Sequence, residues 1–548
     1  MSRGAINMRG IWTQGRLLVG IWARQRKSHL VFLAVFALIG VSIGVWLQVP
    51  ALAVAEAQSS EHFSAADNLT TYGYSNAHDN FNSAETNITA NTARNLKQKW
   101  AHKTGNGVTD QPAIATVGNA TIVYWGSWDG YLHATNMYTS ARVWSTFLGQ
   151  TSDASCNPPI VGVSSSPTVT TINGKLEVLV GGGDADLYAL DAATGQVLWK
   201  TPFPGAAPSN YIWSSPSIYN GSIYIGSSSL GDCPLTQGQL LQLDATTGKL
   251  MHQFDSVPNG CTGGGIWSTP TIDEADNVVY VSTGTQSKCV GANVYAPAIL
   301  KLDASDVSHL LDAWVVPKDQ WIGDSDFGTT PTLFQETING VSTNMVGAAN
   351  KNGIYYAFNR SNIGAGPVWE VSIAFRGSCP QCGGGSVASS AWDGHILYVA
   401  GGKTTINGKA CQGNVRALNP NTITISSSSA SATPTATGTT TPTATGTTTP
   451  TSTSIPNATV SFLWSHCMQA GPVIGSVTVA GATAGNEVVA ASQGPTVIVM
   501  NAVTGKTLAR LTDHQHGSLL YAPPTISDGM LFVGNLDGNL YAYSINGA

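Results

Sequence analysis

Two tryptophans and two carboxylates occupy related positions in a chain that carries few charges. Trp213 and Trp267 each directly precede a Ser-Ser-Pro or Ser-Thr-Pro sequence, and Asp324 and Asp326 lie just before a similar Thr-Thr-Pro that ends at Pro331. An indole beside a carboxylate suits a planar ligand that stacks on the ring and hydrogen-bonds at its edge. Plainer roles stay open, because the tryptophans could fill space and Asp-Ser-Asp could be a polar turn.

These Pro-containing sequences belong to a repeat that extends over most of the chain. Eight copies occur: SSPTV at 165–169, SSPSI at 214–218, STPTI at 268–272, TTPTL at 329–333 and PPTI at 523–526, with weaker copies near Pro112, Ala391 and Pro472. Short alternating strands and turns follow each clear copy, as in IYIGSS at 223–228 and LYALDAATG at 187–195. Four short strands per repeat, joined by glycine-containing turns, are typical of a propeller blade.

We therefore predict an all-β fold, a single eight-bladed β-propeller. The last repeat ends as LYAYSINGA, one strand short, and LKQKW at 96–100 supplies a strand with a tryptophan at the other end. Pairing these two segments would close the propeller and remove its exposed edges. The tryptophans that end the repeats are expected to pack between blades: Trp144, Trp199, Trp314, Trp369 and Trp464.

Equivalent positions of the repeats lie on one rim of a propeller, so the residues just before each copy should crowd the mouth of its axis. This register places there Asp110, Ser164, Trp213, Trp267, Asp324 with Asp326, Ser386, Gln469 and Tyr521.

The N-terminal residues have the pattern of an export signal or a membrane anchor. Residues 1–29 carry only basic charges, and the apolar run at 30–49 is just long enough to span a bilayer. Small residues at 51–57 resemble cleavage sites, so a cleaved signal peptide and a retained anchor both stay open. We expect residues 1–57 to be this segment, 58–90 a lead-in, and 91–548 the propeller. The Ser/Thr/Pro-rich stretch at 424–455 should be a disordered insertion inside one blade.

Charge and cysteine content narrow the class of protein. The chain has 25 basic and 31 acidic residues, whereas nucleic-acid-binding proteins normally have a basic excess. Eight cysteines in an exported chain predict disulfides. Cys379 and Cys382, in Cys-Pro-Gln-Cys, could form a local bridge or a redox pair, and Gly383 stands where a haem-attachment motif needs histidine.

The repeats, with DAATGQVLW at 191–199, resemble the pyrroloquinoline quinone (PQQ) repeats of quinoprotein alcohol dehydrogenases and polyvinyl-alcohol-dehydrogenase-like proteins. GGGIWSTPTID at 263–273 is similar to the segment whose tryptophan lies under the quinone, which implies that role for Trp267. DQWIGDSDFG at 319–328 is similar to the segment with the catalytic aspartate, which implies Asp324. Asp326 then matches an additional ligand of lanthanide-dependent relatives. NKNGIYYAFNR at 350–360 implies that Lys351 contacts the quinone.

The chain departs from the family pattern at the metal site. Thr285 stands where the family has a calcium-binding asparagine, Asp232 is the nearest acid to the position of its glutamate, and no two cysteines are adjacent. The resemblance thus implies calcium or a lanthanide on Asp324, Asp326 and Asp232, with PQQ on Trp267, Lys351 and Trp213.

Two functions follow as hypotheses. The first is an exported quinoprotein-like dehydrogenase that oxidises a small alcohol or polyol with PQQ and passes electrons to an external acceptor. The second is a non-catalytic propeller that serves as a binding or scaffold module at the cell envelope, with a sugar-binding propeller as a variant. In both cases the protein acts at the cell surface or is secreted, and it contacts the membrane only if its N-terminal segment is retained.

Overall fold

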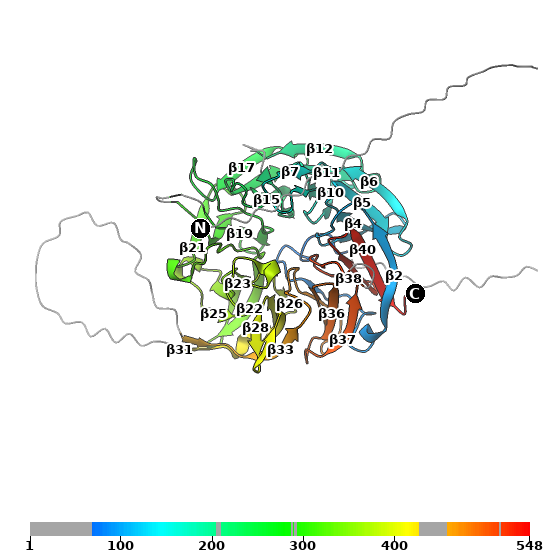
Figure 1. The fold of residues 1–548 in the computed structure, drawn as a ribbon. Helices are drawn as coiled ribbons and strands as arrows, with labels where there is room; N and C mark the ends of the chain where they lie inside the picture. The colour runs from blue at the N-terminus through cyan, green and yellow to red at the C-terminus, as the bar shows by residue number, and fades with distance from the viewer. Residues whose placement is uncertain (1–67, 204–209, 287–288, 290–292, 427–456, 514–516) are drawn as a thin grey trace, which may run out of the picture. The chain divides into compact units, whose positions relative to one another are not determined.

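The computed structural model describes residues 68–548 apart from 204–209, 287–288, 290–292, 427–456 and 514–516. The chain divides into two units, Met1–His62 and Phe63–Ala548, and all described residues lie in the second. In this unit, eight four-stranded antiparallel sheets surround a common axis, so the prediction of an all-β, eight-bladed propeller is confirmed (Figure 1). The expected apolar segment 30–49, the sites at 51–57 and nearly all of the insertion lie outside the described residues. No helix among the described residues is long and apolar enough to span a membrane.

The first four blades contain strands that run in sequence order from the axis outward. Blade 1 has β3 (Ala113–Val117), β4 (Ala120–Gly126), β5 (Tyr131–Asn136) and β6 (Arg142–Phe147). Blade 2 has β9 (Thr168–Ile172), β10 (Lys175–Gly181), β11 (Asp186–Asp191) and β12 (Val197–Pro202). Blade 3 has β14 (Ser217–Tyr219), β15 (Ser222–Ser229), β16 (Gln239–Asp244) and β17 (Leu250–Asp255), with β13 (Asn210–Tyr211) added to β15. Blade 4 has β18 (Thr271–Asp273), β19 (Val278–Ser282), β20 (Ala298–Asp303) and β21 (Leu310–Val315).

The last four blades follow the same plan with two additions. Blade 5 has β22 (Thr332–Ile338), β23 (Val341–Ala349), β24 (Ile354–Asn359) and β25 (Trp369–Ser372). Blade 6 has β26 (Ala391–Trp392), β27 (Leu397–Gly401), β30 (Gly413–Leu418) and β33 (Phe462–Met468). Blade 7 has β34 (Thr478–Ala480), β35 (Val488–Gln493), β36 (Thr496–Asn501) and β37 (Thr507–Thr512), with β1 (Phe81–Asn82) parallel to β34. Blade 8 has β38 (Thr525–Ser527), β39 (Met530–Gly534), β40 (Asn539–Ile545) and, as its outer strand, β2 (Leu96–Lys103).

Short elements decorate the blades. Three two-stranded sheets pair β7 (Thr151–Ser152) with β8 (Ile160–Val161), β28 (Thr404–Ile406) with β29 (Lys409–Cys411), and β31 (Thr424–Ser426) with β32 (Asn457–Thr459). The 3-10 turns are η1 (Ala93–Asn95), η2 (Lys318–Gln320), η3 (Ile363–Ala365), η4 (Pro380–Cys382) and η5 (Pro420–Thr422).

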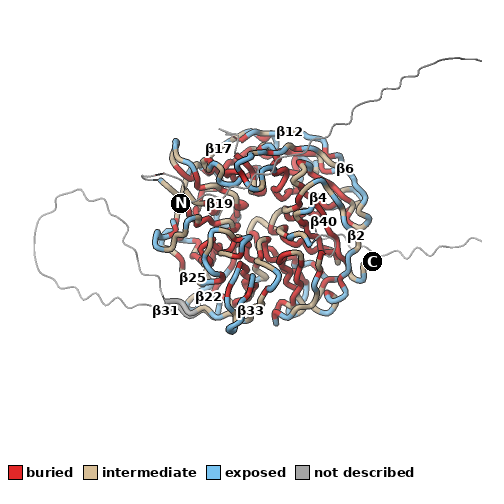
Figure 2. The backbone as a smooth tube through the Cα atoms, viewed as in Figure 1, coloured by how far each residue is buried: buried red, intermediate tan, exposed pale blue. Residues whose placement is uncertain are grey.

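Buried apolar side chains lie between neighbouring blades, and burial falls toward the outer strands (Figure 2). Leu179 and Leu187 of blade 2, for example, pack with Ile223 and Ile225 of blade 3. Two of the five predicted tryptophan contacts are seen as hydrogen bonds to the next blade: the Trp144 indole donates to the Ala192 carbonyl at 3.0 Å, and the Trp464 indole donates to the Ala502 carbonyl at 2.8 Å. Trp144 lies on Gly195, where an added Cβ would come within 2.5 Å of the indole and where φ is +72°. The Thr-Gly turn therefore provides the space that this tryptophan needs.

A series of hydrogen bonds connects blades 2 to 6 around the axis. The backbone N–H of Ser166 donates to Ser215 Oγ at 2.9 Å, and Ser215 N–H donates to Thr269 Oγ1 at 3.2 Å. Thr269 N–H donates to Thr330 Oγ1 at 3.0 Å, and Thr330 N–H donates to Ser389 Oγ at 2.9 Å. In these blades the Ser/Thr of the Pro-containing repeat thus joins one inner strand to the next.

The described part of the expected lead-in, residues 68–90, packs against the inner strands. Its carbonyls accept from inner-strand N–H groups of six blades, at Ile114, Val169, Ile272, Leu333, Trp392 and Val479. The Asn76 and Asn82 amides donate to Ile218 and Ile526 of the remaining two blades. This segment therefore ties all eight inner strands together, which the absence of any repeat pattern in it did not suggest.

Candidate functional site

A cavity of about 720 Å³ lies on the propeller axis, at the ends where the inner strands begin. The residue directly before each repeat copy lines it: Thr109, Ser164, Trp213, Trp267, Gly328, Val387, Ile474 and Tyr521. Two of the expected residues, Ser386 and Gln469, do not line the cavity, and Val387 and Ile474 line it instead. In blade 6 the prediction was one residue early, although β26 begins at Ala391 as the weak copy indicated. In blade 7, β34 begins at Thr478, later than the weak copy near Pro472 indicated. Tyr72 of the lead-in also lines the cavity, and its hydroxyl is 2.5 Å from Ser476 Oγ.

Lys351 and two aspartates form the charged part of this cavity. The Lys351 ammonium lies 2.8 Å from Asp324 Oδ2 and 2.7 Å from Asp326 Oδ2. The aspartates precede β22 and the lysine lies in the turn between β23 and β24, so adjoining connections of blade 5 bring the three residues together. Burial opposes the charge on Lys351, but the two carboxylates outweigh it and raise the pKa of the ammonium.

The Asp324 carboxyl has a pKa that is raised toward neutral pH. Burial, followed by the neighbouring Asp326 carboxylate, raises the pKa of Asp324 to about 6, although Lys351 opposes this shift. Its second oxygen, Oδ1, is buried and has no hydrogen-bond partner among the described residues. Asp324 therefore presents an unsatisfied acceptor in the cavity wall.

Asp232 is the third carboxylate of the group. Oxygens of Asp232, Asp324 and Asp326 all lie within 4.8 Å of one another. Partial desolvation and then the Asp326 charge raise the pKa of Asp232. Asp326 also accepts from the backbone N–H of Thr285, so Thr285 takes part through its backbone. Carboxylate oxygens crowded in this way are typical ligands for a hard cation.

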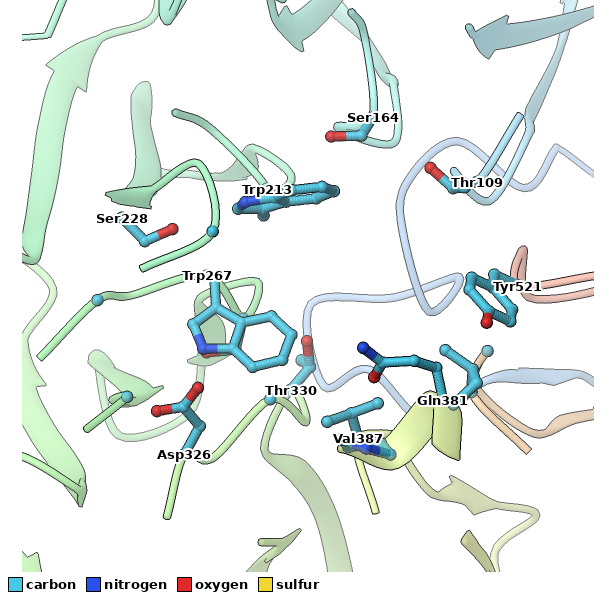
Figure 3. A pocket seen from close by; sticks show the side chains of 18 of the residues that line it. Thr109, Ser164, Trp213, Ser228, Trp267, Asp326, Thr330, Gln381, Val387 and Tyr521 are labelled. Atoms are coloured by element: carbon cyan, nitrogen blue, oxygen red, sulfur yellow. The ribbon is translucent and has the colours of Figure 1, made fainter. Parts of the chain in front are cut away.

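Trp267 and Trp213 form aromatic walls of the cavity (Figure 3). Lys351 Nζ lies 5.5 Å from the centre of the Trp267 ring. An added Cβ on Gly328 would come within 2.1 Å of that indole, so the glycine allows Trp267 to lie flat against the backbone. Trp213 donates from its indole to the Ser229 carbonyl at 3.2 Å and packs edge-on against Tyr211.

The residues predicted to bind the cofactor or metal or to act as the base thus all line one cavity: Trp213, Trp267, Asp232, Asp324, Asp326 and Lys351. Sequence reasoning missed Tyr72 and Gln381, which also line it. No repeat position marks Tyr72, whereas the two flanking cysteines were an available signal for Gln381. The cysteines form four disulfides, Cys156–Cys233, Cys261–Cys289, Cys379–Cys382 and Cys411–Cys467, so the disulfide prediction is confirmed.

The fold and the cavity place the chain in the class of eight-bladed β-propellers that have an acidic and aromatic cavity on the axis. Residues 206–374 match the PQQ family model described as the β-propeller domain of glucose, ethanol and alcohol dehydrogenases. This match confirms the resemblance to PQQ-repeat propellers and covers blades 3 to 5, which supply most of the charged and aromatic site residues.

The chain is also similar to proteins with known names. The chain is 27% identical over 250 residues to the polyvinylalcohol dehydrogenase of a Sphingopyxis species, which covers 38% of this chain and 37% of that protein. It is 26% identical over 314 residues to the quinohemoprotein alcohol dehydrogenase of Comamonas testosteroni, which covers 50% of this chain and 42% of that protein. The chain therefore spans about two fifths of the length of these relatives.

Solved structures show the same fold. The crystal structure of the Comamonas testosteroni quinohemoprotein alcohol dehydrogenase superposes with a TM-score of 0.64 at 18% identity, over 88% of this chain and 81% of that one. A europium-containing methanol dehydrogenase gives a TM-score of 0.62 at 14% identity, over 87% and 98% of the two chains.

Proposed function

We propose that this protein is an exported PQQ-type dehydrogenase that oxidises an alcohol and passes the electrons to an external acceptor. The observation that carries the proposal is the convergence of Trp267, Asp324 and Lys351 on one axial cavity, although they come from two different blades. Pairing of all eight cysteines supports export, since disulfides persist in oxidising compartments. The polyvinylalcohol and quinohemoprotein alcohol dehydrogenases among the relatives support the reaction class.

The residues present fit both a quinone and a cation. A cavity of about 720 Å³ is within the size range of small-molecule sites, and Trp267 offers it a flat face. The buried, unpaired Asp324 Oδ1 and the nearby Asp232 and Asp326 provide oxygen ligands. When bound, PQQ would supply the hydride acceptor and calcium or a lanthanide would supply a Lewis acid.

The chain itself would supply the base and its positioning. With a pKa of about 6, Asp324 is mostly ionised at pH 7 and accepts the proton of a substrate hydroxyl. Lys351 holds that carboxylate in place through a 2.8 Å hydrogen bond, and Trp267 excludes water from one side of the site.

One observation favours the second hypothesis, a non-catalytic binding or scaffold module. Lys351 already bridges Asp324 and Asp326, so their charge is partly balanced without a metal ion. In that case Lys351 would be a structural counter-ion, and the cavity would bind a ligand without turning it over.

A titration distinguishes the two hypotheses. PQQ is added to the purified protein with calcium and then with a lanthanide, while tryptophan fluorescence reports binding and a redox dye reports oxidation of 1-butanol. We expect saturable quenching and turnover in the wild type. Asp324→Asn should keep quenching and lose turnover by about 10²–10⁴-fold, because general bases contribute that much. Asp276→Asn, at an exposed turn after β18, is the matched control. Absence of quenching under all conditions would refute the proposal.

A further inference from the structure

The loop closed by Cys379–Cys382 places one polar side chain over the cavity. Ser378, Pro380 and Gln381 of this loop line the cavity wall. Figure 3 shows the Gln381 amide directed toward the centre of the cavity, on a different side from Asp326. No described residue hydrogen-bonds this amide, and the proposed reaction gives it no role.

The loop holds Gln381 in a defined position. At its base, Gly377 N–H donates to the Lys351 carbonyl at 3.1 Å, and Phe375 N–H donates to the Lys403 carbonyl at 2.7 Å. At its tip, the disulfide encloses Pro380 and Gln381 in η4, and the proline removes further backbone freedom. Because the loop backbone is held in this way, little loop entropy is lost when the exposed Gln381 side chain binds a ligand.

The chemistry of the cavity selects the kind of group that Gln381 contacts. An amide both donates and accepts, which matches a hydroxyl group. Three clustered aspartates line the cavity, Asp232, Asp324 and Asp326, whereas Lys351 is its only cation among the described residues. A carboxylate on the substrate would therefore meet like charge, and an uncharged polar group would not.

We propose that Gln381 determines specificity by hydrogen-bonding a second hydroxyl group of the substrate, so that the preferred substrates are diols or polyols. The inference rests on the proposed function, because it assumes that a first hydroxyl is oxidised at Asp324. The Cys379–Cys382 bridge acts by holding this amide over the cavity.

The test compares 1,3-butanediol with 1-butanol in the PQQ-loaded enzyme. Wild type should have the higher kcat/KM for the diol. Gln381→Leu should lower the diol-to-butanol ratio about three- to tenfold, the range expected for one hydrogen bond, with the loss mainly in KM for the diol. The matched control is Gln196→Leu, an exposed glutamine between β11 and β12.

A second variant tests the role of the disulfide. The Cys379→Ser/Cys382→Ser double variant keeps Gln381 and opens a very short covalent loop, so its melting temperature should stay close to that of the wild type. Its diol-to-butanol ratio should fall in the same direction as in Gln381→Leu. An unchanged ratio in Gln381→Leu overturns the inference while the proposed function stands. If the loaded wild type oxidises neither alcohol, the proposed function fails and this inference falls with it.

Discussion

Replacing Asp326 with asparagine should lower the pKa of Asp324 and make it ionise at more acidic pH. In the wild type, burial and the Asp326 charge both raise this pKa, to about 6. The substitution removes the second cause, keeps the side-chain shape, and leaves Lys351 with Asp324 as its one carboxylate partner in this ion-pair group. Both changes act in the same direction, because each favours the ionised form of Asp324.

The size of the shift can be bounded from the geometry. One carboxylate oxygen of Asp324 and one of Asp326 lie within 4.8 Å of each other. Two unit charges at that separation repel by about 0.9 kcal/mol in water and by about 3.5 kcal/mol at the effective dielectric constant near a protein surface. These energies correspond to a change of about 0.6 to 2.5 in the pKa of Asp324. Because about a quarter of the Asp324 side chain is exposed, at 26%, we expect a fall of about one unit, near the solvent-screened end of this range.

The assay is a carboxyl titration of the metal-free, cofactor-free protein by ¹³C NMR, with Asp324→Asn used to assign the signal. Asp276→Asn is again the control, since that carboxylate is exposed on a turn away from the cavity lining. A pKa of Asp324 that stays near 6 or rises in Asp326→Asn would show that the two carboxylates are not coupled as the structure indicates.

Three further perturbations test the cofactor face, the closure of the propeller and the insertion. Trp267→Ala should weaken PQQ binding at least about tenfold in a fluorescence or calorimetric titration, because it removes the stacking face; unchanged affinity would place the quinone elsewhere. Deleting residues 91–103 should lower the melting temperature by about 10 °C or more, since β40 loses its partner and the buried Trp100 is lost; a variant that melts like the wild type would disprove this role of β2. Replacing residues 427–456 with a two-residue turn should change stability little, because β31 pairs with β32 and loop entropy changes by only about 0.6 kcal/mol per doubling of length; a large fall in melting temperature would show that the insertion packs against the blades.

The periodic features were predictable from the sequence because the same physical requirement recurs in every blade. A tryptophan on an outer strand needs a glycine opposite it, so Trp144 and Gly195 appear at matching places of successive repeats. Contacts that occur once were not predictable in this way. Tyr72 reaches Ser476 across 404 residues, and no repeat position or motif surrounds it. The pairing of Lys351 with both Asp324 and Asp326 depends on side-chain directions that spacing alone does not fix.

Two neighbouring positions of the repeat explain why a regular propeller can hold an irregular site. In blades 2 to 6 a hydroxyl at one position, as in Ser166, Ser215 and Thr330, accepts from the backbone of the preceding blade, and this bond constrains the residue there to be small and polar. The residue two positions earlier lines the cavity and, among the described residues, accepts no hydrogen bond from the preceding blade's backbone. Its size therefore varies among the blades, from Gly328 to Trp267. Constraint at one position keeps the inner strands in register, so a substitution at the other can change the cavity without opening the propeller. On this argument, changes at Trp213 or Val387 should alter ligand preference more than stability, whereas Thr330→Val should lower the melting temperature because it leaves the Thr269 N–H unpaired. Equal melting temperatures for Thr330→Val and the wild type would contradict it.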